Sequence, residues 1–247
     1  MVDPEHSSWW SSESKRENER LPEQVKREER RPAEIVRPIT MGSGVGSVVD
    51  ERIVKYPLYN SFNYSLFLPS DYKTIRISLG ITSPNLGEGK TTAVCNLATA
   101  IALGTGRKTI VVDSNLRRPR VHEIFGIPRG PGLGEALMGG EICVVPTQIE
   151  NLFVLPAGKI TTVSNFKIPS FRELLSSLFT EFEFVLVDMP SVAAGNFPTL
   201  IANQLTGLVV VVKQKKTKRK DIARLFRRVR KETILGFVMN EVNENDF

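Results

Sequence analysis

A short stretch with two glycines, a lysine and two threonines constrains the fold of this chain more than any other feature. It runs Ser83-Pro84-Asn85-Leu86-Gly87-Glu88-Gly89-Lys90-Thr91-Thr92, between the apolar run 74–81 and a helical pattern over 92–103. Where a strand passes into a helix, small residues let backbone N–H groups converge on phosphates, a lysine reaches the β/γ oxygens, and a hydroxyl binds Mg²⁺. Lys90 and Thr91 suit the last two roles, so the stretch is predicted to be a phosphate-binding loop.

The match to the pattern G-x-x-x-x-G-K-[ST] is imperfect, because Pro84 stands at the position of the first glycine. Gly87 and Gly89 still allow tight backbone turns. The alternative is a glycine-rich turn between a strand and a helix that only packs. Features elsewhere in the chain favour the phosphate-binding loop.

The composition allows one folded domain with a polar appendage. The chain has 247 residues, of which 41% are hydrophobic, and a chain of this kind can build one core of about 200 residues. Cys95 and Cys143 lie in apolar runs without metal-ligand spacing, which predicts buried free thiols in a reducing compartment. No apolar run approaches the roughly 20 residues that span a bilayer, and the charged N-terminus lacks the apolar segment of a secretion signal. A cytoplasmic protein is therefore expected.

Residues 1–50 differ from the rest, being dense in charged residues and serine and poor in aliphatic residues. They are predicted to form a disordered or partly helical arm, with the folded domain over residues 51–247. Both tryptophans, Trp9 and Trp10, lie in this arm. Exposed aromatic side chains there indicate a docking peptide for a partner or for the membrane interface, and the alternative is a simple spacer.

From residue 71 onward, short apolar strands alternate with amphipathic helices. This alternation predicts an α/β fold with a doubly wound, mainly parallel sheet flanked by helices on both faces. The predicted strands cover residues 74–81, 108–113, 152–155, 184–188, 208–212 and 236–240. The predicted helices cover residues 91–103, 134–138, 171–181, 197–203 and 217–231.

Two of the predicted strands end in an aspartate, Asp113 and Asp188. In doubly wound sheets ligands bind at the carboxyl ends of the strands. An apolar strand that ends in one carboxylate fits a Walker B motif, in which the carboxylate orients Mg²⁺ directly or through water, and this role is assigned to Asp188. The alternative for each aspartate alone is a helix N-cap or a turn residue.

In these motifs and their order, the chain resembles the cytoplasmic domain of the bacterial tyrosine kinases, or BY-kinases, of the CpsD/CapB and Wzc type. These kinases belong with the MinD/ParA P-loop ATPases. The likeness covers residues 55–243. It is carried by GEGKTT at 87–92, IVVDSNLRRP at 110–119, GLGEALMGG at 132–140, LPAGK at 155–159, RELLSS at 172–177, the strand ending at Asp188, and GFVMN at 236–240.

The resemblance implies an ATP site with Mg²⁺, built from Walker A, a second acidic motif called Walker A′ at Asp113, and Walker B at Asp188. The implied catalytic residues are Lys90, Asp113 and Asp188, and the implied metal ligands are Thr91, Asp113 and Asp188. The implied nucleotide-binding residues are Gly87, Glu88, Gly89, Lys90, Thr91, Thr92 and Asn240. Asn240 would meet the adenine edge, which suits an amide that both donates and accepts hydrogen bonds. Family members act with a membrane polysaccharide co-polymerase in exopolysaccharide or capsule biosynthesis and export.

The chain departs from the family at the Walker A′ motif, where the second of two aspartates is Asn115. An amide keeps an acceptor but loses the charge that helps to hold Mg²⁺ or to take a proton from a hydroxyl. Phosphoryl transfer depends mainly on positioning and electrostatic stabilisation, so this change is expected to slow catalysis while leaving nucleotide binding intact.

Two further departures concern tyrosines and subunit contacts. The family carries a tyrosine-rich C-terminal cluster, whereas this sequence has no tyrosine after Tyr72, so tail autophosphorylation of the family kind is not expected. Before the loop, the family has a Glu and two Arg that join subunits in a ring. Tyr56, Tyr59 and Phe62 stand there instead. Core packing is the favoured interpretation of these aromatics, a different interface is the alternative, and homo-oligomerisation stays open.

Residues 213–231 carry eleven Lys or Arg residues against one acidic residue, Asp221. Apolar residues at i, i+3, i+4 and i+7 predict a helix with one face on the sheet and a positive outer face. They are Ile222, Leu225, Phe226 and Val229. The positive face is interpreted either as a merely solvated surface or as a contact for an anionic membrane. Nucleic acid is the less favoured partner, although ParA-like proteins bind DNA through basic surfaces.

Three functions follow, in order of preference. The first is an ATP-binding, kinase-like protein recruited to the inner face of the cell membrane, weakly active or inactive as a tyrosine kinase (a pseudokinase). The second is a non-catalytic scaffold with the same fold. The third is a ParA/MinD-type positioning ATPase. Those proteins have a signature lysine where this chain has Asn85, and this difference argues against the third function.

Overall fold

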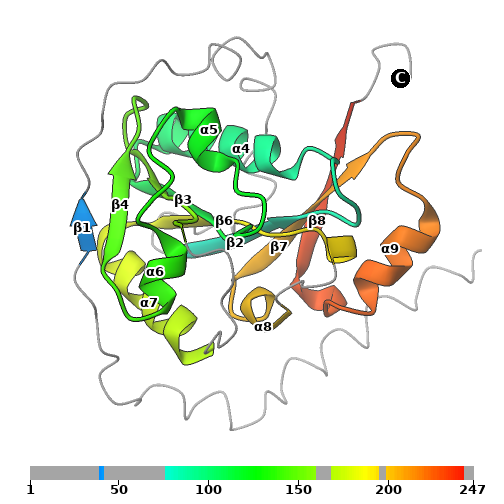
Figure 1. Cartoon of the computed structure of the whole chain (residues 1–247). Helices are drawn as coiled ribbons and strands as arrows, with labels where there is room; N and C mark the ends of the chain where they lie inside the picture. Colours follow the sequence, from blue (N-terminus) through cyan, green and yellow to red (C-terminus); the bar gives the residue numbers. More distant parts are fainter. Residues whose placement is uncertain (1–38, 42–75, 160–167, 195–198, 242–247) are drawn as a thin grey trace, which may run out of the picture. The chain divides into compact units, whose positions relative to one another are not determined.

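A computed structural model describes residues 39–41, 76–159, 168–194 and 199–241. In these ranges eight strands pair in the order β1-β4-β5-β3-β6-β2-β7-β8 (Figure 1). All neighbours are parallel except β4 and β5, which are antiparallel. The non-consecutive order confirms the predicted doubly wound, mainly parallel sheet.

The predicted strands are confirmed to within a few residues. They are β2 (Ile77–Thr82), β3 (Thr109–Asp113), β5 (Leu152–Leu155), β6 (Phe184–Asp188), β7 (Gly207–Lys213) and β8 (Ile234–Asn240). Every residue of β2, β3 and β6 is buried, as expected for central strands covered on both faces. Two strands were not predicted, β4 (Ile142–Pro146) and β1 (Ile39–Met41). Both are short and lie toward one edge of the sheet, where β4 pairs in parallel with β1 and antiparallel with β5.

Most of the observed helices lie where helices were predicted, but several of them differ from the predictions in length. Observed are α4 (Lys90–Thr105), α6 (Leu133–Leu137), α7 (Ile168–Glu181) and α8 (Thr199–Ala202), besides the unpredicted α5 (Val121–Phe125) and the 3₁₀ turns η3 (Val192–Ala194) and η4 (Lys231–Thr233). The predicted helix 217–231 is wrong in length, because α9 covers only Arg219–Phe226. Like charges three and four positions apart, as at Arg224, Arg227 and Arg228, oppose its continuation.

Two apolar clusters hold helices against the two faces of the sheet. On one face Val94, Leu97 and Ile101 of α4 pack with Phe125 of α5. On the other face the core includes side chains of α6, α7, α8 and α9, with Leu225 and Val229 contributed by the basic segment. Figure 1 shows the same division, with α4 and α5 above the sheet and α6 to α9 below it. The layer order is therefore helix, sheet, helix, as predicted.

The parallel strands place their carboxyl ends at one edge of the sheet. The glycine-rich loop follows β2, Asp113 ends β3, Asp188 ends β6 and Asn240 ends β8. This edge is where doubly wound sheets bind ligands. The predictions for Trp9, Trp10, Tyr56, Tyr59 and Phe62 concern residues outside the described ranges.

Candidate functional site

Two glycines set the shape of the loop between β2 and α4. Gly87 and Gly89 have φ angles of 74° and 89°, in the left-handed region that glycine adopts without steric cost. A Cβ atom at position 89 would lie 2.1 Å from Nδ2 of Asn240. The same Nδ2 donates a hydrogen bond to the Glu88 carbonyl at 3.0 Å. The structure therefore places Asn240, the last residue of β8, directly against the loop.

Pro84, at the position of the missing first glycine, is accommodated by the segment that follows β6. The carbonyls of Ser83 and Pro84 accept hydrogen bonds from the N–H groups of Val192 and Ala193, at 2.9 and 3.0 Å. Both contacts use carbonyl oxygens, so the missing N–H of proline costs no bond here. These two hydrogen bonds hold the backbone at the start of the loop, although Pro84 replaces the first glycine of the motif.

The loop ends in a buried cluster of one lysine, one threonine and one aspartate. Lys90 Nζ lies 3.1 Å from Asp188 Oδ1 and 3.2 Å from Thr91 Oγ1. The Thr91 hydroxyl donates to Asp188 Oδ2 at 2.8 Å. Lys90 is 8% exposed and Asp188 is fully buried, so this ion pair is screened little by solvent. Both oxygens of Asp188 are occupied by the two residues that begin α4.

Asp113 faces Asp188 across the paired strands β3 and β6. Its carboxylate accepts backbone hydrogen bonds from Asn115, Arg120 and Val121, each at 3.1 Å. Burial, followed by the nearby charge of Asp188, raises the pKa of Asp113 to about 7, although the backbone donors oppose the shift. Burial also raises the pKa of Asp188, against the effect of Lys90 and Thr91. Two buried carboxylates side by side favour a proton or a cation between them.

The arrangement fits a magnesium ion held together with phosphate, rather than a cage made by the protein alone. In the described part of the chain, no group of three or more His, Cys, Asp or Glu side chains could hold a metal. Mg²⁺ usually takes one or two protein oxygens and completes its shell with water and substrate phosphates. The Thr91 hydroxyl donates its proton to Asp188 and accepts from Lys90 Nζ, so one lone pair of its oxygen remains to face a cation.

Asn115 uses its amide in a local turn. Its Nδ2 donates to the Arg118 carbonyl at 2.9 Å, and its own carbonyl accepts from the Arg118 N–H at 2.9 Å. An aspartate could not make the first of these bonds, because an ionised carboxylate has no donor. The asparagine that replaces the second Walker A′ aspartate is thus used by the turn, which needs its side-chain donor.

Glu88 is the buried carboxylate of the loop itself, with 3% exposure. It accepts hydrogen bonds from the Asn85 N–H at 2.8 Å, from Asn85 Nδ2 at 3.2 Å, and from the Thr217 hydroxyl. The Asn85 side chain also bonds to Asp221, which contributes to a lowered pKa of that carboxyl after the larger effect of the Lys218 N–H. The loop is therefore tied to the start of α9.

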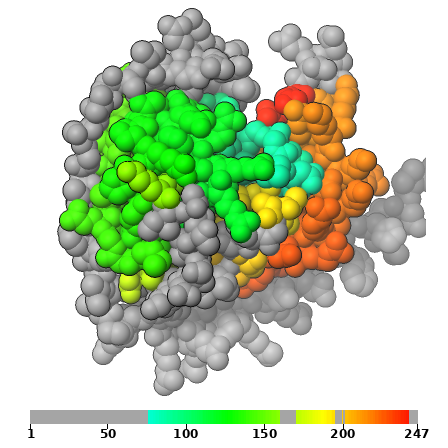
Figure 2. All heavy atoms as spheres, viewed as in Figure 1, coloured from blue at the N-terminus to red at the C-terminus, as the bar shows by residue number. Residues whose placement is uncertain are grey.

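The structure brings most of the predicted site residues together. Gly87 to Thr91, Asp113, Asp188 and Asn240 lie at one edge of the sheet, whereas the Thr92 side chain is exposed in the first turn of α4. Thr217 and Asp221 were not predicted, because more than 120 residues separate them from the loop and no local motif marks them. Figure 2 shows the cyan part of the chain, which includes the loop, against the orange part, which includes α9.

Two other predictions bear on the surroundings of the site. Cys95 and Cys143 are both free, as predicted, but only Cys95 is buried and Cys143 is half-exposed on β4. Among the described helices, none has the length and apolar character needed to cross a bilayer.

Curated proteins with similar sequences are tyrosine kinases. The chain is 30% identical over 177 residues to the tyrosine-protein kinase YwqD of Bacillus subtilis, a match that covers 66% of this chain and 71% of that protein. It is 27% identical over 177 residues to the tyrosine-protein kinase CpsD of Streptococcus agalactiae, covering 68% and 75% of the two chains. No protein-family profile matches the chain.

Solved structures with the same fold include kinases and an ATPase. The chimerical protein CapA2B2 superposes with a TM-score of 0.66 and 26% identity, covering 84% of this chain and 95% of that one. The cell division ATPase MinD of Pyrococcus furiosus superposes with a TM-score of 0.57 and 24% identity over 70% of this chain and 75% of that one. The second likeness shows a shared fold only.

Proposed function

Because the chain belongs to the bacterial tyrosine kinases, we propose that it binds Mg·ATP where β2, β3, β6 and β8 end. We propose further that it acts with a membrane polysaccharide co-polymerase in exopolysaccharide or capsule biosynthesis and export. The observation that carries the nucleotide part is the buried cluster of Lys90, Thr91 and Asp188 at the start of α4. A lysine, a hydroxyl and a carboxylate at a helix N-terminus match the needs of a bound triphosphate.

Each residue of this cluster has a separate task in the proposed site. Lys90 pairs with Asp188 in the free protein, and its ammonium group would hold the β/γ phosphates of a bound nucleotide. Gly87 and Gly89 hold the loop backbone open to phosphate, and the positive end of the α4 dipole favours the same charge. Mg²⁺ would be held by the Thr91 hydroxyl and, through water, by Asp188, where it would neutralise charge on the phosphates.

Asn240 and Asp113 complete the proposed site. Asn240 lies against Gly89, which supports the adenine contact implied by the family. Asp113 presents a second carboxylate opposite Asp188. With Asn115 in place of the second Walker A′ aspartate, the site lacks one charge that would activate a hydroxyl. We therefore propose that the protein binds ATP but is weakly active or inactive as a kinase.

The family supplies the argument for the polysaccharide machinery. The chain is similar to CpsD of Streptococcus agalactiae, and kinases of the CpsD/CapB and Wzc type act with a membrane polysaccharide co-polymerase. The proposal places this chain beside a membrane co-polymerase as a nucleotide-dependent partner or regulator. Recruitment to the inner face of the membrane is part of the same proposal.

Titration calorimetry of Mg·ATP and Mg·ADP into the purified protein tests the nucleotide site. Binding is expected for the wild type and for Lys108→Ala, a control at an exposed surface lysine, and it is expected to be lost in Lys90→Ala. Turnover gained in Asn115→Asp would show that the missing carboxylate limits catalysis. A well-folded wild type that binds neither nucleotide would overturn the proposal and favour a scaffold.

A further inference from the structure

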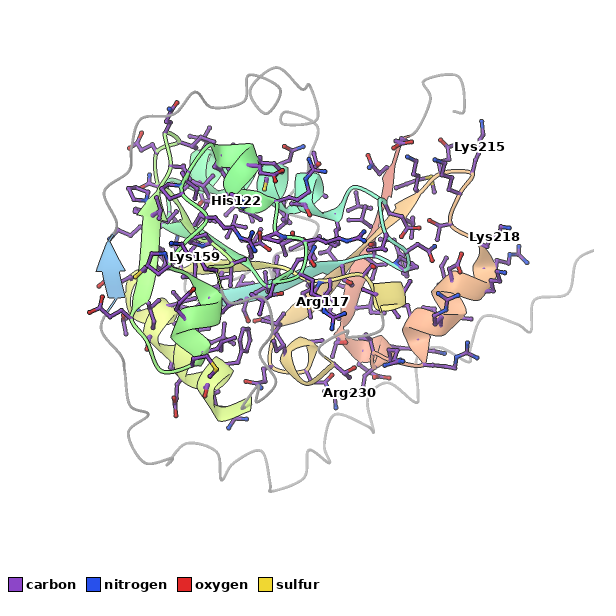
Figure 3. All side chains as sticks on the ribbon, in the orientation of Figure 1. Arg117, His122, Lys159, Lys215, Lys218 and Arg230 are labelled. Atoms are coloured by element: carbon purple, nitrogen blue, oxygen red, sulfur yellow. The ribbon has the colours of Figure 1, made fainter. Side chains whose placement is uncertain are left out.

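The segment that follows β7 forms a strongly positive surface outside the nucleotide site. Of the eleven Lys and Arg residues between Lys213 and Lys231, nine have exposed side chains: Lys215, Lys216, Lys218, Arg219, Lys220, Arg227, Arg228, Arg230 and Lys231. Figure 3 shows Lys215 and Lys218 extending outward from the loop and from the start of α9. The acidic residue within the segment, Asp221, is 7% exposed and bonded to the Lys218 N–H and to Arg224.

Apolar side chains attach this segment to the domain, while most of its charged side chains are exposed. Buried Leu225 and partly buried Phe226 of α9, and buried Val229 just after the helix, pack in the same core. Like charges at neighbouring positions on a helix lower its stability. Because like-charge repulsion makes such a dense positive face unfavourable by itself, the face indicates an anionic partner.

Large apolar side chains lie beside the basic surface. Phe237 and Met239 of the edge strand β8 are 45% and 58% exposed. In the parallel register they pair with Val210 and Val212 of β7, which belong to the core face covered by α9. The Phe237 ring lies 6.5 Å from the ring of Phe226, and Lys231 Nζ lies 5.5 Å above the Phe226 ring. Basic and apolar groups thus share one continuous surface.

We propose that the exposed basic residues of segment 215–231, together with Phe237 and Met239, dock the protein on an anionic lipid bilayer. Headgroup phosphates would meet the Lys and Arg side chains, and Phe237 and Met239 would enter the acyl boundary. A basic face next to exposed apolar side chains is the composition of interfacial membrane contacts. Nucleic acid phosphates would use the same positive charge but give no reason for an exposed methionine and phenylalanine beside it.

Sedimentation with vesicles tests the electrostatic part of this surface. Nucleotide-free wild type is expected to bind phosphatidylcholine vesicles that contain phosphatidylglycerol and not pure phosphatidylcholine. The variant Arg227→Gln/Arg228→Gln is expected to bind about thirtyfold more weakly, since each basic residue near an anionic bilayer contributes a factor of about five. The control Arg76→Gln/Arg172→Gln removes two exposed charges from other elements and is expected to bind like the wild type.

A second variant tests the apolar part. Phe237→Ala/Met239→Ala is expected to lose the fraction of vesicle binding that survives high salt, because that fraction does not depend on screened charge. Far-UV circular dichroism checks that each variant is folded. An equal loss in the control pair, equal binding to neutral vesicles, or binding to duplex DNA without binding to vesicles would each overturn the proposal. Omitting nucleotide keeps the result independent of the ATP site.

Discussion

At the scale of single residues, buried charges determine how the candidate site behaves. Lys90, Asp113 and Asp188 together carry one positive and two negative groups, all largely removed from water. Lys90 pairs with Asp188 at 3.1 Å, whereas Asp113 is held only by backbone donors. Removing one of these three groups is therefore expected to change the protonation of the other two and the stability of the protein.

Lys90→Met is expected to lower the free energy of unfolding, because it leaves Asp188 buried without its cation. Breaking a buried pair in this way costs about 3–5 kcal/mol. Adding Asp188→Asn is expected to restore part of that loss while nucleotide binding stays absent. Urea unfolding measures the stability and calorimetry measures the binding. Equal stability of the single and the double variant would show that Lys90 does not compensate Asp188.

The pKa of Asp113 gives nucleotide binding a pH dependence. At a pH below about 7 its carboxyl is mostly protonated in the free protein, and a divalent cation beside the pair must displace that proton. Affinity for Mg·ATP is therefore expected to rise by up to about tenfold per pH unit as the pH approaches the pKa, and to level off above it. Calorimetry in buffers of different ionisation enthalpy detects the proton release. Affinity that is flat on the acidic side would refute the assignment.

At the scale of secondary-structure elements, the loop before α4 is joined to the start of α9. Glu88 receives hydrogen bonds from Asn85 within the loop and from Thr217 of the basic segment. The Thr217 hydroxyl in turn accepts from the Lys213 N–H at 2.8 Å. The end of β7, the loop and α9 are therefore expected to respond together when nucleotide binds.

Thr217→Val removes this hydroxyl with little change in side-chain shape. Because Glu88 keeps its two bonds from Asn85, we expect a loss of about 1–2 kcal/mol in the free energy of unfolding and a severalfold weaker affinity for Mg·ATP. Thr180→Val is the matched control, since its hydroxyl bonds only to the nearby Ser177 carbonyl within α7. Thermal unfolding and calorimetry are the measurements. Identical results for the two variants would mean that the tie is unimportant.

At the scale of the whole molecule, the site belongs to the sheet rather than to one motif. Its residues come from the ends of β2, β3, β6 and β8, which are spread across the sheet order. A ligand that contacts all of these ends binds the folded sheet and has no equivalent site in the unfolded chain. Nucleotide is therefore expected to stabilise the entire domain.

Mg·ATP at a hundredfold excess over its dissociation constant is expected to add about 2.7 kcal/mol to the free energy of unfolding. For a domain of this size that amounts to a rise of roughly 5–10 °C in Tm. Lys90→Met/Asp188→Asn should show no rise. Calorimetric or fluorescence-monitored melting measures the shift, and a shift of equal size in the double variant would place the nucleotide elsewhere.

Most of the fold follows from local patterns in the sequence. Strands such as Phe184–Asp188 are continuous apolar runs that end in a polar residue, and their limits are visible without the structure. The short strands β1 and β4 and the early end of α9 were not predicted. The two strands are defined by pairing with their neighbours, and α9 ends where like charges come close together.

The sequence alone determined the parallel α/β class, the loop around Lys90, the two strand-end aspartates and the density of positive charge after β7, since each is a property of contiguous residues. Only the tertiary structure decided which distant groups meet. The fold buries Asp113 and sets it opposite Asp188, and burial, followed by the charge of Asp188, raises the pKa of Asp113. The strand order also brings Asn240 to Gly89 and Thr217 to Glu88. Burial and proximity arise from chain segments more than 70 residues apart, and no local pattern encodes them.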